Sequence, residues 1–143
     1  ETPVILLHPV LSSLGGNSKK MSSSDPATAI FMDDLENEVT TKVKKAFCAE
    51  KNVDNNPVLE LVKFILLPFN KSFEVARDDK NGGNKVYTTI EDVEADFKDG
   101  SLHPSDLKPA VSKALNVILN PVREHFKKNQ QMKQLADAVK KFK

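Results

Sequence analysis

A short segment near the start of the chain holds the residues with the clearest capacity for chemistry. It reads Lys20, Met21, Ser22, Ser23, Ser24. An ammonium group beside hydroxyl groups and backbone amides can bind a polyphosphate, because the lysine neutralises charge while the hydroxyls and amides donate hydrogen bonds. A solvated linker that caps the next helix has a similar composition, and composition alone favours that linker. The order of the residues is what makes the segment a candidate phosphate-binding site.

A second candidate site stands between His103 and Lys108. Asp106 has a carboxylate, which can accept hydrogen bonds from both the N1–H and the N2–H₂ of guanine, a pair of donors that no other base presents. His103 stands three residues earlier. A structural role explains the same residues: Asp106 would cap a helix that begins at Leu107, and His103 would be a loop residue before Pro104. Spacing alone favours the structural role.

Composition and charge exclude several classes of protein. The chain has 143 residues, of which 39% are hydrophobic, and this suits one compact domain or a domain with part of another. Its 21 basic and 20 acidic residues give a formal net charge of +1. A polybasic nucleic-acid arm is therefore excluded, whereas a small, shaped nucleic-acid site is not.

Cysteine, histidine and apolar spacing exclude further classes. Cys48 is the only cysteine, which excludes an intrachain disulfide and a Cys-cluster zinc site and fits a reducing compartment. The three histidines have no metal-ligand spacing, and no apolar run approaches the ~20 residues that span a bilayer. We therefore expect no metal site and no membrane span, and we expect a cytoplasmic protein.

The hydrophobic pattern predicts a mainly α-helical chain with one β-hairpin. Residues 4–7 are an apolar run typical of a buried parallel strand, and residues 12–26 are a loop of small polar residues. A helix is predicted from about residue 34, with Asp33 and Glu36 as an acidic capping box. Its apolar stripe is Leu35, Val39, Val43, Ala46 and Phe47, and its outward lysines are Lys42, Lys44 and Lys45.

A second helix begins at Pro57 behind an Asn56 cap and contains the most apolar stretch of the chain, residues 58–67. Because it is apolar on nearly all sides, we expect it to be the central buried helix. Alternating residues at 73–76 and 86–90, separated by turn residues 78–84, predict a β-hairpin.

Three helices are predicted to complete the chain. The first runs from about residue 90 to 97 and ends at Gly100. The second has Pro109 near its start and a kink at Pro121, and the third is amphipathic. The apolar residues of the last two are Leu107, Val111, Ala114, Leu115, Ile118, Val122 and Phe126, then Met132, Leu135, Val139 and Phe142.

The segment from Lys20 to Ser24 resembles the Lys-Met-Ser-Lys-Ser signature of class I aminoacyl-tRNA synthetases, in its serine-substituted form. It follows the expected buried strand, where that class places it. Over almost the whole chain the sequence resembles the tyrosyl-tRNA synthetase family of eukaryotic and archaeal type. The matching blocks are 8–9, 44–48, 52–56, 77–80, 82–87, 92–97, 102–108 and 121–126. The Gly-Gly-Asn block at 82–84 and the His-Pro-Ser-Asp-Leu-Lys block at 103–108 favour the tyrosyl over the tryptophanyl enzymes.

The resemblance implies two parts and a role for the loop. Residues 1–33 are the last strand and signature loop of a Rossmann-type catalytic domain, and residues 34–143 are a helical anticodon-binding domain. In the family, tyrosine and ATP (with Mg²⁺) give tyrosyl-adenylate and pyrophosphate, and the tyrosyl group then passes to tRNA-Tyr. Lys20 matches the lysine that stabilises charge on the leaving pyrophosphate. Ser23 stands where the longer signature has a second lysine, so fewer cations meet the phosphates.

The resemblance also implies an anticodon site. Asp106 matches the aspartate that binds the first anticodon base, a guanine, and His103 matches the histidine beside it. Cys48 stands at a corner that the family places near the anticodon loop, although a lone cysteine on an apolar stripe is more often a core residue. Asn81 replaces an aromatic residue that stacks on the guanine. Such stacking is worth about 1–3 kcal/mol per base, so we expect weaker anticodon binding or another ring in its place.

The family also needs a His-x-Gly-His element, in which two histidines are three residues apart. The three histidines of this chain, His8, His103 and His125, are too far apart to form it. We therefore expect the chain to be the C-terminal portion of a tyrosine–tRNA ligase, inactive alone and dependent on the N-terminal catalytic half. A homodimer or pseudo-dimer is implied for the complete protein. Two alternatives stay open: a non-catalytic tRNA-binding module, such as a degenerate second copy in a tandem synthetase, and a plain helical interaction domain.

Overall fold

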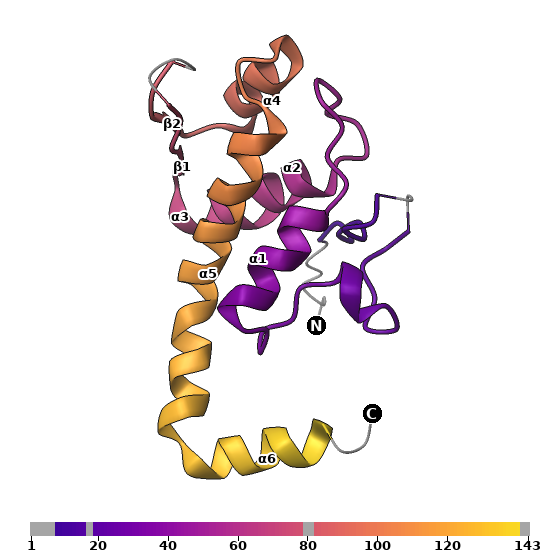
Figure 1. Ribbon diagram of the computed structural model, residues 1–143, viewed down its shortest axis with the longest axis vertical. Coiled ribbons are helices and arrows are strands. Elements are labelled where there is room, and N and C mark those ends of the chain that lie inside the picture. The colour runs from indigo at the N-terminus through magenta and orange to yellow at the C-terminus, as the bar shows by residue number, and fades with distance from the viewer. Residues whose placement is uncertain (1–7, 17–18, 79–81, 141–143) are drawn as a thin grey trace, which may run out of the picture.

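The computed structural model describes residues 8–16, 19–78 and 82–140 (Figure 1). The strand predicted at residues 4–7 and the candidate site residue Asn81 lie outside the described residues. The described part is mainly helical with one two-stranded antiparallel sheet, as the sequence predicts. In chain order its elements are η1 (Pro26–Thr28), α1 (Glu36–Lys45), α2 (Pro57–Leu61), η2 (Val62–Leu66), α3 (Leu67–Asn70), β1 (Phe73–Val75), β2 (Lys85–Tyr87), α4 (Ile90–Asp99), α5 (Pro104–Lys128) and α6 (Gln130–Lys140).

Helix α1 begins at Glu36, two residues later than predicted. The backbone N–H of Leu35 donates a hydrogen bond to the Glu38 carboxylate at 2.7 Å. A glutamate at the third helical position is where a capping box needs it, so the box predicted for Asp33 and Glu36 is wrong by two residues. The sequence pattern did not separate these two registers, because acidic residues occupy both.

Three side chains of the pattern predicted for α1 differ from the prediction. Leu35, the first residue of the predicted apolar stripe, precedes the helix and is 56% exposed. Lys42 does not face solvent: its Nζ lies 2.7 Å from Oδ2 of Asp34, and its side chain is only 16% exposed. Phe47 lies beyond the helix, because the backbone turns extended at Ala46 and the Phe47 N–H bonds to the Leu14 carbonyl at 2.7 Å. The ring of Phe47 is therefore exposed rather than part of the buried stripe.

Helices α2, η2 and α3 form one continuous helical segment, and half of its residues are buried. Asn56 caps its start, since the side-chain oxygen accepts hydrogen bonds from the N–H groups of Val58 and Leu59. The buried residues of the segment are Pro57, Val58, Leu59, Leu61, Val62, Leu66 and Leu67.

The helical segment passes through Pro68 and continues to Asn70. In a regular α-helix the proline ring would collide with the carbonyl four residues earlier. Here η2 is π-helical, and the Leu67 N–H bonds to the carbonyl of Val62, five residues back. This wider turn makes room for the ring. The segment ends at Lys71, whose φ of 62° is left-handed.

Strands β1 and β2 form the predicted hairpin, with Phe73 opposite Tyr87 and Val75 opposite Lys85. The side chains of Phe73, Val75 and Tyr87 are buried, whereas Val86 is 60% exposed. The inward residue of the second strand is therefore the aromatic one rather than its aliphatic neighbour.

Helix α5 runs along the length of the molecule, and α1, η2, α2 and β1 pack against it (Figure 1). It begins at Pro104 and continues without interruption through Pro109 and Pro121. Helix α6 leaves its lower end at an angle, confirming the predicted last helix, and Leu135 and Val139 on α6 are exposed. Within the described residues, no helix is long and apolar enough to cross a membrane.

Asp96 connects helix α4 to strand β2 of the hairpin by two hydrogen bonds. Its Oδ2 accepts hydrogen bonds from Lys85 Nζ at 2.6 Å and from the Tyr87 hydroxyl at 2.7 Å. Partial burial opposes ionisation of Asp96, but the hydrogen bonds from Lys85 and Tyr87 outweigh it and lower the pKa of this carboxyl. Burial and the hydrogen bond to Asp96 raise the pKa of Tyr87, so the phenol keeps its proton and acts as the donor.

We predict that Asp96→Asn lowers the free energy of unfolding by about 1–2 kcal/mol at pH 7. The variant removes a charged acceptor of two hydrogen bonds, one of which comes from a lysine that is 42% exposed and therefore screened. A depressed carboxyl pKa stabilises the fold above the unfolded-state value of about 3.9, and this contribution is lost as the pH falls through the folded-state pKa. The difference between wild type and variant should therefore shrink below about pH 4, which urea unfolding at a series of pH values measures.

The matched control for this experiment is Asp54→Asn. The Asp54 side chain is exposed and makes no hydrogen bond within the described part of the chain. This control should stay within about 0.5 kcal/mol of wild type at every pH. A stability loss in Asp96→Asn that is the same at neutral and strongly acidic pH would contradict the ionic role of Asp96.

Candidate functional site

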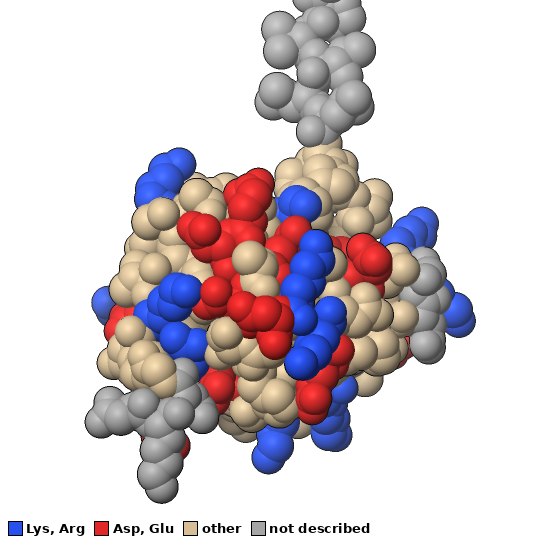
Figure 2. Space-filling view, turned by 90° about the horizontal axis from the view of Figure 1, so that it is seen from above, with Lys and Arg blue, Asp and Glu red and all other residues tan. Residues whose placement is uncertain are grey.

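The end of the molecule formed by the hairpin, α4 and the start of α5 has a mixed surface charge. Figure 2 looks onto this end and shows Lys and Arg side chains interspersed with Asp and Glu rather than a continuous basic face. This distribution matches the net charge of +1. Non-specific attraction to nucleic acid is weak on such a surface, so recognition here depends on the shape and chemistry of a particular site.

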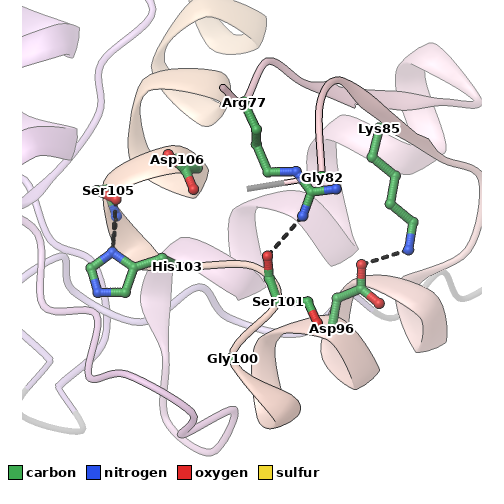
Figure 3. Close-up of a pocket in the computed structure, with 9 residues that line it drawn as sticks. All are labelled: Arg77, Gly82, Lys85, Asp96, Gly100, Ser101, His103, Ser105 and Asp106. Atoms are coloured by element: carbon green, nitrogen blue, oxygen red, sulfur yellow. Dashed lines mark hydrogen bonds and ion pairs between the residues drawn. The ribbon is translucent and has the colours of Figure 1, made fainter. Parts of the chain in front are cut away.

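An open cavity of about 680 Å³ lies where the hairpin, the end of α4 and the start of α5 meet (Figure 3). We call it the hairpin cavity. Its lining combines basic, acidic and hydroxyl side chains with two glycines. The lining residues are Arg77, Gly82, Lys85, Asp96, Gly100, Ser101, His103, Ser105 and Asp106. Two predicted site residues, His103 and Asp106, are thus brought together.

Asp106 is the third residue of α5 and is half-buried at the wall of the hairpin cavity. Because α5 begins at Pro104 rather than Leu107, the alternative in which Asp106 caps the helix is wrong. The carboxylate accepts no hydrogen bond from any residue that the structure describes. Both of its oxygens are therefore available to a ligand.

His103 is the N-cap of α5, a role that the sequence pattern did not predict. Its Nδ1 accepts a hydrogen bond from the Ser105 N–H at 3.1 Å, and the Ser105 hydroxyl lies 2.7 Å away. Its Nε2 lies 2.8 Å from the Glu50 carboxylate. Since Nδ1 accepts from the backbone, the ring proton belongs on Nε2, where it is donated to Glu50. These contacts fix the orientation of an imidazole ring that is half exposed at the rim.

Arg77 is a lining residue to which sequence reasoning assigned no role. Its Nε donates to the Gly83 carbonyl at 3.0 Å, and its Nη1 donates to the Ser101 carbonyl at 2.7 Å. It therefore joins the hairpin turn to the link between α4 and α5 (Figure 3). The turn itself needs glycine, since Gly82 and Gly83 have φ of 88° and 69°. The sequence feature that could have indicated Arg77 is its position directly before the strong turn sequence at residues 78–84.

Cys48 lies apart from the other anticodon residues that were predicted and that the structure describes. Cys48 does not line the hairpin cavity. It packs against the hydrophobic core, and its Sγ accepts a hydrogen bond from Asn56 at 3.5 Å. Burial raises the pKa of this thiol. Asn81 lies outside the described residues, although its neighbour Gly82 is part of the lining.

The loop at residues 20–24 forms a second location, away from the lining of the hairpin cavity. Lys20 is exposed, and its ammonium makes no contact within the described residues. Met21 packs against the core, and its N–H bonds to the Leu11 carbonyl at 2.8 Å. The Ser22 hydroxyl lies 3.2 Å from that of Ser24. In the described part of the chain, no group of three His, Cys, Asp or Glu side chains could hold a metal ion.

Comparisons with known proteins identify relatives over nearly the whole chain. Residues 1–120 match the family described as tRNA synthetases class I (W and Y). The cytoplasmic tyrosine–tRNA ligase 2 of Arabidopsis thaliana is 53% identical over 141 residues, which are 99% of this chain and 19% of the relative. The cytoplasmic ligase 1 of the same plant is 49% identical over 140 residues, 98% of this chain and 36% of that relative.

Solved structures agree with the sequence relatives. Tyrosyl-tRNA synthetase from Aeropyrum pernix has a TM-score of 0.78 at 39% identity, covering 92% of this chain and 38% of the other. The enzyme from Archaeoglobus fulgidus, complexed with L-tyrosine, has a TM-score of 0.75 at 42% identity, covering 81% and 35%. The chain spans less than two fifths of the length of each of these four relatives. With a family match over 120 residues and close relatives across its length, the chain belongs to the tyrosyl-tRNA synthetase family of class I aminoacyl-tRNA synthetases.

Proposed function

We propose that this chain is the C-terminal portion of a tyrosine–tRNA ligase, in which the hairpin cavity binds the first anticodon base of tRNA-Tyr. The observation that supports this most directly is the Asp106 carboxylate, which lines the cavity without a partner among the described residues. The two oxygens of one carboxylate match the N1–H and N2–H₂ donors of guanine. Adenine presents an acceptor at N1, so it offers the carboxylate no matching pair of donors.

The remaining cavity residues supply orientation and charge for such a base. The His103 ring, held by Ser105 and Glu50, offers a surface on which a base can stack. The planar guanidinium of Arg77, held by two carbonyls, offers another. These groups provide stacking where Asn81 replaces the aromatic residue usual in the family. The domain division at residue 33 and an anticodon contact by Cys48 belong to the same proposal.

We further propose that the loop at residues 20–24 binds the pyrophosphate part of ATP, which enters with Mg²⁺. When the tyrosine carboxylate attacks the α-phosphate, negative charge grows on the leaving pyrophosphate. The exposed ammonium of Lys20 would stabilise that charge, and the hydroxyls of Ser22, Ser23 and Ser24 would donate hydrogen bonds. The loop acts mainly on the transition state, because the charge it meets is greatest there.

The partners and location follow from the same proposal. The complete enzyme would combine this chain with an N-terminal catalytic half, use tRNA-Tyr as substrate and assemble as a homodimer or pseudo-dimer. This chain alone would be inactive. Both Arabidopsis relatives are named cytoplasmic, and we propose the cytoplasm for this protein.

A second candidate function is a degenerate, non-catalytic copy within a tandem synthetase. The matched segment is about equally long in the two Arabidopsis relatives, but it makes up 36% of ligase 1 and 19% of ligase 2. Ligase 2 is therefore about twice as long as ligase 1 and has room for a second copy. Asn81 in place of the aromatic residue favours this reading, whereas Lys20 and Asp106 argue against it. Pyrophosphate exchange by the complete protein separates the two functions.

Lys20→Ala in the complete enzyme should slow adenylate formation on the order of 100-fold, because a positively charged group is removed from the developing pyrophosphate. The loss should fall on kcat in tyrosine-dependent pyrophosphate exchange. The melting temperature should not change, since an exposed loop lysine makes no core contact. Lys113→Ala, the same change on the exposed part of α5, is the control and should exchange at the wild-type rate. An unchanged exchange rate in Lys20→Ala would contradict the proposal that the loop binds pyrophosphate.

Asp106→Asn should weaken binding of tRNA with guanine at the first anticodon position by about 1–3 kcal/mol. The amide presents a donor where guanine also donates, whereas tRNA with adenine there should bind almost as before. Because His103 caps α5, the melting temperature should stay close to that of wild type. Asp137→Asn on α6 is the matched control. If Asp106→Asn keeps the wild-type ratio of affinities for guanine over adenine, the carboxylate does not bind the base.

A further inference from the structure

Glu60, on helix α2, makes a contact that reaches 48 residues back in the sequence. Its Oε2 accepts a hydrogen bond from the Ser12 backbone N–H at 2.8 Å, and its Oε1 accepts one from the Ser12 hydroxyl, also at 2.8 Å. The contact is partly buried. A carboxylate bound in this two-pronged way fixes both the position and the rotation of the residue that donates to it.

Ser12 is directly paired with Lys20. The two residues form an antiparallel β-bridge, flanked by hydrogen bonds from Ser13 N–H to the Lys19 carbonyl at 2.7 Å and from Met21 N–H to the Leu11 carbonyl at 2.8 Å. Residues 11–13 and 19–21 therefore form a short antiparallel pair, which we call the stem, and the candidate phosphate-binding Lys20 is part of it. Glu60 holds this stem at the residue opposite Lys20.

No other described group neutralises Glu60. It forms no ion pair with any residue that the structure describes, so its charge is satisfied by the two donors of Ser12. The rest of the stem contacts the helical part through apolar packing, since Leu11 and Met21 pack against the core. Apolar contacts set the depth of the stem, whereas a directional pair of hydrogen bonds is needed to set its orientation.

We infer that Glu60 is a positioning residue for Lys20, through which the helical part of the chain holds the phosphate-binding loop in its working orientation. This inference rests on the proposed function of the loop. Glu60 does not touch the nucleotide. Its effect comes from keeping the Lys20 ammonium where pyrophosphate charge develops, since misplacing a group by about 1 Å can cost on the order of 100-fold in rate.

The test compares Glu60→Gln and Ser12→Ala in the complete enzyme, measured by tyrosine-dependent pyrophosphate exchange. Glutamine keeps an acceptor oxygen for the Ser12 N–H, but it removes the charge and reverses the second hydrogen bond, because its NH₂ can only donate to the Ser12 hydroxyl. Ser12→Ala removes only the hydroxyl bond. We expect kcat to fall on the order of tenfold in Glu60→Gln and less in Ser12→Ala. The KM for tyrosine and the affinity for tRNA should stay at wild-type values. Glu74→Gln, an exposed glutamate on β1, is the control of matched charge.

A double-mutant cycle with Lys20→Ala distinguishes an effect of Glu60 through Lys20 from a general structural role of Glu60. If Glu60 acts through Lys20, then Glu60→Gln causes no further loss of kcat in a chain that already has Lys20→Ala. Losses that multiply independently would overturn the inference, as would a wild-type kcat in both Glu60→Gln and Ser12→Ala when Lys20→Ala alone is slow. A wild-type rate in Lys20→Ala itself would instead overturn the proposed function of the loop, and the inference with it.

Discussion

The burial of one face of helix α5 is the constraint on which the rest of the structure depends. Leu107, Val111, Leu115 and Leu119, spaced by four residues, are each at most 4% exposed. Four residues are close to one helical turn, so these side chains form a single stripe along the helix. Helices α1 and α2, η2 and strand β1 all pack against α5. The stripe begins one residue after Asp106, and therefore the packing of the core fixes the wall of the hairpin cavity.

A polar network fixes how α5 meets the segment before α1. Arg123 is 9% exposed, and its Nε donates to the Asp34 carbonyl at 2.7 Å while its Nη2 donates to Asn116 at 2.8 Å. The Asp34 carboxylate is in turn paired with Lys42. Buried charges cost desolvation free energy, so such a network contributes more to the geometry of the junction than to net stability. No buried side-chain polar atom in the described part of the chain lacks a hydrogen-bond partner, which is what a single defined arrangement requires.

The sequence predicted the type of each described helix and strand more reliably than the residue at which it begins or ends. Periodicity identifies a helix over many residues, whereas a cap depends on one side chain, and Glu36 and Glu38 are equally good candidates by sequence. A regular α-helix does not accept Pro68 at its position, and nothing in the residue types indicates the π turn that accommodates the proline ring. In the site, Asp106 and His103 were found through local motifs. Arg77 and Glu60 were not, because their partners Ser101 and Ser12 are 24 and 48 residues away.

The two candidate sites are attached to one packed body at different points. Asp106 stands on α5, and Glu60, which accepts two hydrogen bonds from Ser12 opposite Lys20, stands on α2, a helix that packs directly against α5. Protein interiors are close-packed and compress little, so the separation of two groups on adjoining buried helices is nearly constant. Binding at the hairpin cavity would alter the loop only by moving α2 relative to α5. The apolar packing between the buried faces of the two helices opposes that movement, so the arrangement of α2 and α5 favours a fixed position for the segment that Glu60 contacts.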